Sequence, residues 1–302
     1  PQGSETVEYL NWIKSQDNRV VVIDYKDNLW STEDPQRPLD LMDHALHDVA
    51  TGDLVFLLND DDFIGEDYLE KMVRLFLENP SCTTAAGLPV QVNVDGKVME
   101  GALERTLARN ARPRYMPGHL AVMDFFLSDN PTLWASTCCV FTIKREAYIN
   151  AGGIQRGEHY ASFYGVVPFG VTGFDQTALL YTREHRHQLN RTQRLEGNDG
   201  GHYVMVALQN MKVEERWRQA FGDELATRVV RAIKDKTYAK MKVHADALFQ
   251  QGLLFQQEKL KTALGQYQRC LIVNPESADV HHRIGDINLM LGKFDEAKHS
   301  YV

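Results

Sequence analysis

The sequence predicts an α/β domain followed by an all-α tail. Two short apolar runs, Arg19–Asp24 and Asp53–Leu58, alternate with segments of helical periodicity in the first part of the chain. Such alternation is typical of a sheet whose strands are covered by helices on both faces. From about Asn210 onward the whole chain reads as helix. We therefore expect an α/β domain, a helical connector and a helical tail, with boundaries at 1–198, 199–241 and 242–302.

The elements of the α/β domain follow from the spacing of apolar residues. Val7, Leu10 and Ile13 recur at helical spacing and predict the first helix. A later helix is expected to end at Asn79, because proline follows it. The expected helices are Glu5–Ser15, Leu39–Ala50 and Glu66–Asn79, and the expected strands or strand-like runs are Arg19–Asp24, Asp53–Leu58, Ala86–Val92, Cys138–Ile143 and Phe163–Val171.

The last part of the chain repeats with a period of 34 residues, which separates Ala263 from Ala297 and Tyr267 from Tyr301. A helix–turn–helix period of this length resembles the tetratricopeptide repeat, in which small residues let paired helices approach closely. The resemblance implies one complete and one truncated repeat and an array that continues beyond Val302. It also implies a protein partner bound through the repeats.

Composition limits the classes of partner and compartment. The chain has 302 residues, with 33 Lys and Arg against 41 Asp and Glu, and a formal net charge of −8. This balance argues against a nucleic-acid partner, since phosphate contacts need clustered basic side chains. No apolar run reaches the roughly 18 residues that span a bilayer, so no transmembrane segment is expected. Four cysteines without a Cys-x-x-Cys spacing favour a reduced, cytoplasmic location. A peripheral position at the inner face of the membrane is compatible with that location.

An acidic cluster follows the apolar run Asp53–Leu58. Asn59 is followed by three consecutive carboxylates, Asp60, Asp61 and Asp62. Adjacent carboxylates repel one another unless solvent or a cation neutralises them. Hard oxygen ligands suit Mg²⁺ or Mn²⁺, and ligands of α/β sheets sit beyond the carboxyl ends of strands. The cluster therefore indicates either a solvated loop or a divalent metal site.

The segment Ala50–Asp62 resembles the pattern A-x-G-D-x-[VIL]-x-F-L-D-x-D-D of family 2 glycosyltransferases, which have a GT-A (Rossmann-like) fold. Four further segments resemble that family's motifs in the same order along the chain. They are Gly3–Thr6, Asp43–Leu46, Phe141–Ala147 together with Ala151–Ile154, and Leu180–His185. The resemblance covers Gly3 to about Asn190 and implies a nucleotide-diphosphate sugar as donor. It also implies inverting transfer of the sugar to a hydroxyl of a glycan or protein acceptor.

Carried over residue by residue, the resemblance implies a site for the donor and its metal. Asp61 stands as the principal ligand of Mg²⁺ or Mn²⁺, with Asp62 and His185 as further ligands. Asp60 supports the site on the substrate side. Two more substrate-binding side chains are expected to meet the donor, namely Arg183 and His187.

The catalytic base has two candidates. Glu158 stands in the Glu158-His159 pair that replaces the family's Glu-Asp pair, and Asp175 lies only ten residues before His185. A carboxylate with a raised pKa can deprotonate an acceptor hydroxyl. The sequence leaves both candidates open.

The departures from the family support an alternative function. Asn59 replaces the first acid of the motif, and the family's first strand, with the Asp that ends its second strand, would precede Pro1. The alternative is a catalytically degenerate protein that binds a nucleotide sugar, or a scaffold that acts through its tetratricopeptide repeats.

Overall fold

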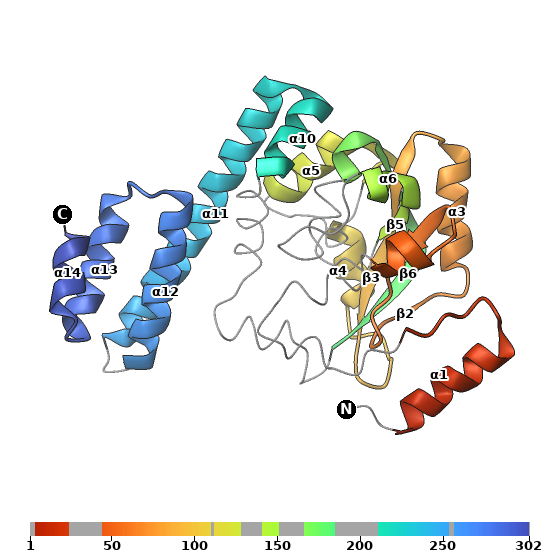
Figure 1. The fold of residues 1–302 in the computed structure, drawn as a ribbon, viewed down its shortest axis with the longest axis horizontal. Coiled ribbons are helices and arrows are strands. Elements are labelled where there is room, and N and C mark those ends of the chain that lie inside the picture. Colours follow the sequence, from red (N-terminus) through yellow and green to blue (C-terminus); the bar gives the residue numbers. More distant parts are fainter. Residues whose placement is uncertain are drawn as a thin grey trace.

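The computed structural model describes residues 4–23, 44–109, 112–127, 141–150, 166–184, 211–253 and 257–301. It has a mixed α/β part and a helical C-terminal part, which extends away from the sheet (Figure 1). None of the helices in these ranges is both long and apolar enough to cross a membrane.

The sheet is mixed. Its strands are β1 (Leu54–Phe56), β5 (Phe141–Lys144), β3 (Cys82–Val92), β6 (Val171–Arg183) and β2 (Phe63–Ile64), in that spatial order, and β4 (Tyr115–Pro117) also pairs with β6. β3 and β6 run parallel at the centre, and the remaining pairs are antiparallel. The βαβ alternation in the sequence therefore leads to an α/β fold whose sheet is not purely parallel.

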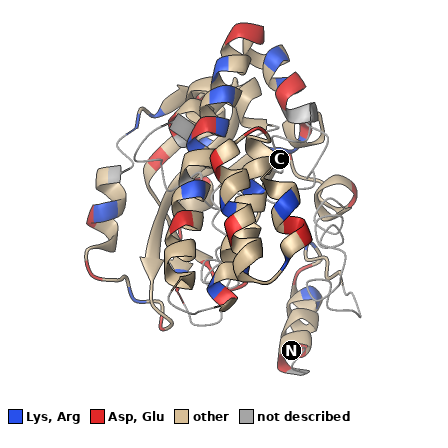
Figure 2. Cartoon of the chain, turned by 90° about the vertical axis from the view of Figure 1, so that its left-hand side faces the viewer, with Lys and Arg blue, Asp and Glu red and all other residues tan. Residues whose placement is uncertain are grey.

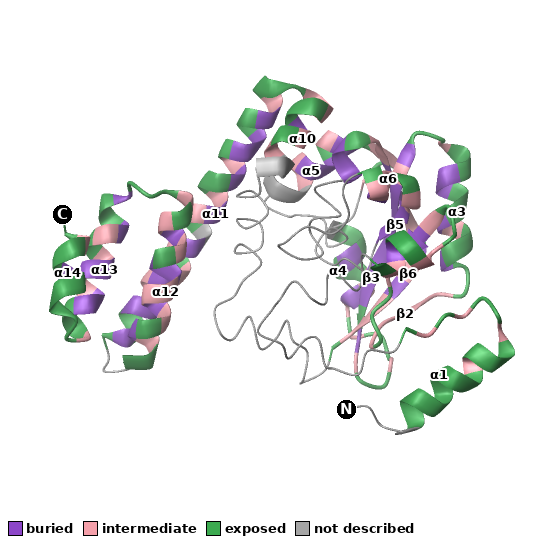
Figure 3. Cartoon of the chain, in the orientation of Figure 1, coloured by how far each residue is buried: buried purple, intermediate pink, exposed green. Residues whose placement is uncertain are grey.

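Helix α3 (Tyr68–Glu78) packs against β3 and β6 and confirms the helix expected at Glu66–Asn79. Tyr68, Met72, Leu75 and Phe76 are buried and share one helical face. β3 is buried along almost its whole length, as expected for a central strand covered on both faces (Figure 3).

The N-terminal elements only partly follow the prediction. Helix α1 (Ser4–Gln16) forms where Glu5–Ser15 was expected, and it lies apart from the sheet (Figure 1). The central strand expected at Arg19–Asp24 is wrong for the described residues Arg19–Ile23, which pair with none of the described strands, and a run without a paired neighbour lacks the hydrogen bonds that stabilise a strand. Of the helix expected at Leu39–Ala50, the described part is a π-helical turn, Ala45–Val49.

A second correction concerns the strand-like run expected at Phe163–Val171. The described residues Val167–Phe169 form a 3₁₀ turn, η5, with proline in its first positions, and β6 begins only at Val171. This turn packs against α5 (Gly118–Leu127).

The short helices α4 (Ala102–Arg109) and α6 (Arg145–Asn150) complete the described α/β part. Helix α10 (Met211–Phe221) joins it to the tail: Trp217 is fully buried, and α10 contacts the η5 turn.

Helices α11 (Asp223–Gly252), α12 (Gln257–Val273), α13 (Ala278–Met290) and α14 (Phe294–Ser300) follow. Each packs on the next, and α11 runs unbroken across the domain boundary that we expected between residues 241 and 242. Acidic and basic side chains are interspersed on the tail helices (Figure 2).

Candidate functional site

The acidic cluster forms a closed turn between β1 and β2. The amide N–H of Asp62 donates to the carbonyl of Asn59 at 3.3 Å. The Asn59 side-chain amide donates in return to the Asp62 carboxylate at 3.1 Å. We call residues Asn59–Asp62 the acidic turn. Asn59, which departs from the family motif, thus helps to close this turn.

The acidic turn is joined to the carboxyl end of β6. Oδ1 of Asp62 accepts the backbone N–H of Arg183 at 3.0 Å across 121 residues of sequence. Phe63 and Ile64, directly after the turn, pair with Tyr181 and Leu180 of β6. The structure therefore brings together two segments, Asp60–Asp62 and Arg183, that the sequence assigned to the same site.

Arg183 is held beside the acidic turn by contacts that sequence reasoning did not anticipate. Its guanidinium donates to the carbonyl of Val94 at 3.3 Å and lies over the ring of Phe63, 5.8 Å from the ring centroid. Phe63 stacks on Tyr181 with ring centroids 4.7 Å apart. The sequence did contain a signal for this arrangement, because Tyr181 and Arg183 are two residues apart and would lie on the same face of a strand.

The three carboxylates of the acidic turn differ in their hydrogen bonds and in their exposure. Both Asp62 oxygens accept hydrogen bonds within the protein, which gives this residue a role in holding the turn. Asp60 is exposed and makes no hydrogen bond or ion pair with the described part of the chain. Asp61 is half-buried. Carboxylate oxygens fit the hard-ligand preference of Mg²⁺ or Mn²⁺, so Asp60 and Asp61 suit the expected metal.

Three predicted site residues, Glu158, His185 and His187, lie outside the described residues. Among the side chains that the structure does describe, no three His, Cys, Asp or Glu converge as a metal-binding group. The third ligand expected from the sequence, His185, is the residue after Glu184, where the described part of β6 and its flank ends.

Asp175 belongs to a different cluster. Its carboxylate accepts the backbone N–H and hydroxyl of Thr177 at 2.9 and 2.7 Å, and the Arg114 guanidinium at 3.3 Å. Burial acts to raise the pKa of Asp175, but the bonds from Thr177 and the charge of Arg114 outweigh it and hold the pKa below its ordinary value. A lowered pKa makes a carboxylate a weaker base.

The structure also separates Asp175 from the acidic turn. Its neighbour Phe174 pairs with Ala86 of β3, whereas Arg183 pairs with Val92. Six residues of extended strand correspond to roughly 20 Å. The two predictions, Asp175 as base and the acidic turn as donor site, therefore do not meet in one site.

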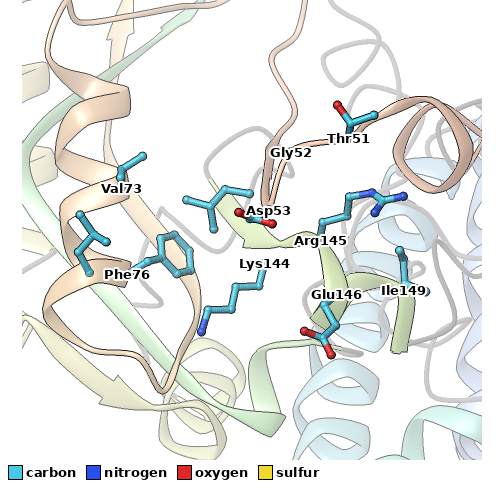
Figure 4. A pocket seen from close by; sticks show the side chains of 11 residues that line it. Thr51, Gly52, Asp53, Val73, Phe76, Lys144, Arg145, Glu146 and Ile149 are labelled. Atoms are coloured by element: carbon cyan, nitrogen blue, oxygen red, sulfur yellow. The ribbon is translucent and has the colours of Figure 1, made fainter.

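An open pocket of about 620 Å³ lies at the other end of β1 (Figure 4). It is lined by Thr51, Gly52, Asp53, Leu54, Val73, Phe76, Leu77, Lys144, Arg145, Glu146 and Ile149. The guanidinium of Arg145 donates to the carbonyls of Leu46 and His47 at 3.0 and 2.6 Å, and Lys144 donates to that of Pro80 at 2.6 Å. Both cations thus donate to backbone carbonyls.

Comparison with known proteins adds no assignment. No protein-family model matches the chain, and no curated protein matches it.

Proposed function

We propose that the chain is the donor-binding part of a glycosyltransferase that moves a sugar from a nucleotide-diphosphate sugar to an acceptor hydroxyl with inversion. The observation that supports this most is the hydrogen bond from the Arg183 backbone to Asp62. This bond, together with the pairing of β2 and β6, brings two motif segments that lie far apart in the sequence to one place in the fold. Their meeting place is the carboxyl end of β6, and ligands of α/β sheets bind beyond the carboxyl ends of strands.

Each residue has a defined task in this proposal. Asp60 and Asp61, together with His185, would hold Mg²⁺ or Mn²⁺, which supplies charge neutralisation for the leaving diphosphate. Arg183, held over Phe63, places a fixed positive charge next to the same group. Glu158 takes the proton of the acceptor hydroxyl as that oxygen bonds to the anomeric carbon and the bond to the diphosphate breaks.

The test is calorimetric titration with Mn²⁺ alone, and then with nucleotide-diphosphate sugars in the presence of Mn²⁺. We expect Asp61→Asn to weaken Mn²⁺ binding at least about tenfold, because one of few charged ligands is lost. Asp53→Asn is the matched control, since Asp53 is an exposed acid at the opposite end of β1. Equal Mn²⁺ affinity in Asp61→Asn and Asp53→Asn would show that the acidic turn holds no metal.

Turnover distinguishes this proposal from the non-catalytic alternative. In an enzyme, Glu158→Gln should lower the rate of sugar transfer far more than donor affinity, because a base acts in the transition state. Donor binding without measurable transfer or donor hydrolysis would instead identify a degenerate nucleotide-sugar-binding protein. A protein partner bound through the helical tail is compatible with both functions.

A further inference from the structure

The chain turns back on itself directly after β3, in a segment that we call the β3 hairpin, residues Asn93–Lys97. The Asn93 side chain folds it, because its Oδ1 accepts the backbone N–H of Asp95 at 3.0 Å and that of Lys97 at 2.9 Å. In addition, the Asn93 N–H donates to the Lys97 carbonyl and the Gly96 N–H donates to the Asn93 carbonyl, each at 2.9 Å. Asparagine commonly fixes turns by bonding backbone groups that follow it. Two of the bonds that hold the β3 hairpin therefore end on one side chain.

The β3 hairpin contacts the surroundings of the acidic turn at two points. The Val94 carbonyl accepts a hydrogen bond from the Arg183 guanidinium at 3.3 Å. The Gly96 backbone approaches the Phe63 ring, since a Cβ added at Gly96 would stand 3.6 Å from Cζ of Phe63. Gly96 has a φ of +78°, a left-handed conformation that glycine adopts without strain. Phe63 directly follows the acidic turn, and the Arg183 backbone donates to Asp62, so both contacts reach the candidate donor site.

Arg183 needs such contacts to act as a fixed charge. An arginine side chain has several rotatable bonds, and immobilising it when a ligand binds costs part of the binding free energy. The Phe63 ring and the Val94 carbonyl both restrain the guanidinium. Its planar set of N–H donors matches the oxygen atoms of a phosphate group. A guanidinium that is already oriented should therefore bind a diphosphate more tightly than a mobile one.

We propose that Asn93 is a positioning residue of the donor site. It folds the β3 hairpin so that the Val94 carbonyl holds the Arg183 guanidinium in place for a diphosphate group. This role rests on the proposed function, since the diphosphate is that of the nucleotide sugar. Asn93 acts through Val94 and Arg183 and not by contact with the ligand.

The first test measures the order of the Arg183 guanidinium by NMR without metal or ligand. The Nε–H signal of Arg183 is assigned by its loss in Arg183→Lys, and its order parameter is obtained from nitrogen relaxation. We expect a value below about 0.6 in Asn93→Ala, which is typical of flexible groups, and a higher value in the parent chain. Asn93→Asp keeps an acceptor oxygen at this position and should restore the parent value.

Asn79→Ala is the matched control. Asn79 is half-buried like Asn93, and its Oδ1 accepts the N–H of Ser81 at 3.1 Å in another turn. Asn79 precedes β3 and Asn93 follows it, so the two turns lie at opposite ends of one strand. Asn79→Ala should leave the order parameter of Arg183 unchanged.

The second test is calorimetric titration with inorganic pyrophosphate in the presence of Mg²⁺, which presents a diphosphate without nucleotide or sugar. We expect Asn93→Ala to weaken binding about two- to tenfold, as follows from the cost of immobilising one long side chain. In the Arg183→Lys background, Asn93→Ala should cause no further loss, because its effect passes through the guanidinium.

Each contrary result overturns the proposal. If the parent chain binds pyrophosphate and Asn93→Ala changes neither the affinity nor the order of Arg183, the β3 hairpin does not position Arg183, although the proposed function stands. Losses of affinity that add in the double variant would mean that Asn93 supports the fold and does not act through Arg183. A parent chain that binds no pyrophosphate with Mg²⁺ would refute the donor site itself, and the role of Asn93 with it.

Discussion

Replacing Asp62 by alanine removes the carboxylate that joins the acidic turn to the end of β6. The backbone N–H of Arg183 then loses its acceptor at 3.0 Å, and the Asn59 amide loses its acceptor at 3.1 Å. The first bond is partly buried and has a charged acceptor, whereas the second is exposed. A hydrogen bond to a charged group contributes about 1.5–3 kcal/mol, and an exposed one much less.

We therefore expect Asp62→Ala to lower the free energy of unfolding by about 2 kcal/mol. In a chain of this size that corresponds to a decrease of about 3–6 °C in the melting temperature. Asp60→Ala is the matched control because Asp60 is an exposed carboxylate of the same turn without such bonds. Its effect should stay within about 0.5 kcal/mol.

The assay is thermal unfolding followed by circular dichroism in the presence of EDTA, so that metal binding does not contribute. Under these conditions Asp62→Ala and Asp60→Ala should differ, whereas in Mn²⁺ titrations Asp60→Ala should lose affinity without losing stability. Equal melting temperatures for the two variants without metal would refute the assignment of Asp62 as the residue that holds the turn.

Two further predictions concern packing and pH. Gly118→Ala should lower the free energy of unfolding by more than about 2 kcal/mol, because an added Cβ would collide with the carbonyl of Val167. Gly265 lies in open space within α12, so Gly265→Ala should raise the free energy of unfolding by up to about 1 kcal/mol. Thermal unfolding of both variants gives the comparison. The lowered pKa of Asp175 means that its contribution to stability is present above its ordinary pKa of 3.8 and is lost as the pH falls below it. Asp175→Asn should therefore be about 1 kcal/mol less stable than the parent in urea unfolding at pH 7, and this difference should narrow as the pH falls below 3.8. A difference that stays constant or widens on acidification would contradict this sign.

Sequence patterns alone predict the elements whose stability is mainly local. Helix α3 carries its buried face at helical spacing and ends before Pro80, so its position was predictable from periodicity and a stop signal. The helical tail was predictable for a similar reason, since a 34-residue period fixes where small and aromatic residues face a neighbouring helix. The acidic cluster after β1 was also visible, because three carboxylates directly after an apolar run are unusual in any context.

Which strands form, and which distant residues share a site, depends on tertiary pairing that local patterns do not contain. A strand is stabilised by pairing with a neighbour. The described residues Arg19–Ile23 pair with no described strand despite their β-branched sequence, whereas β6 continues past the polar run Asp175–Thr177, which bulges out of the β3 register, because it pairs with β3 on both sides of that run. The same dependence explains the site. The hydrogen bond from Arg183 to Asp62 joins residues 121 positions apart, and the roughly 20 Å that separate Asp175 from that bond follow from strand register, which no local pattern encodes.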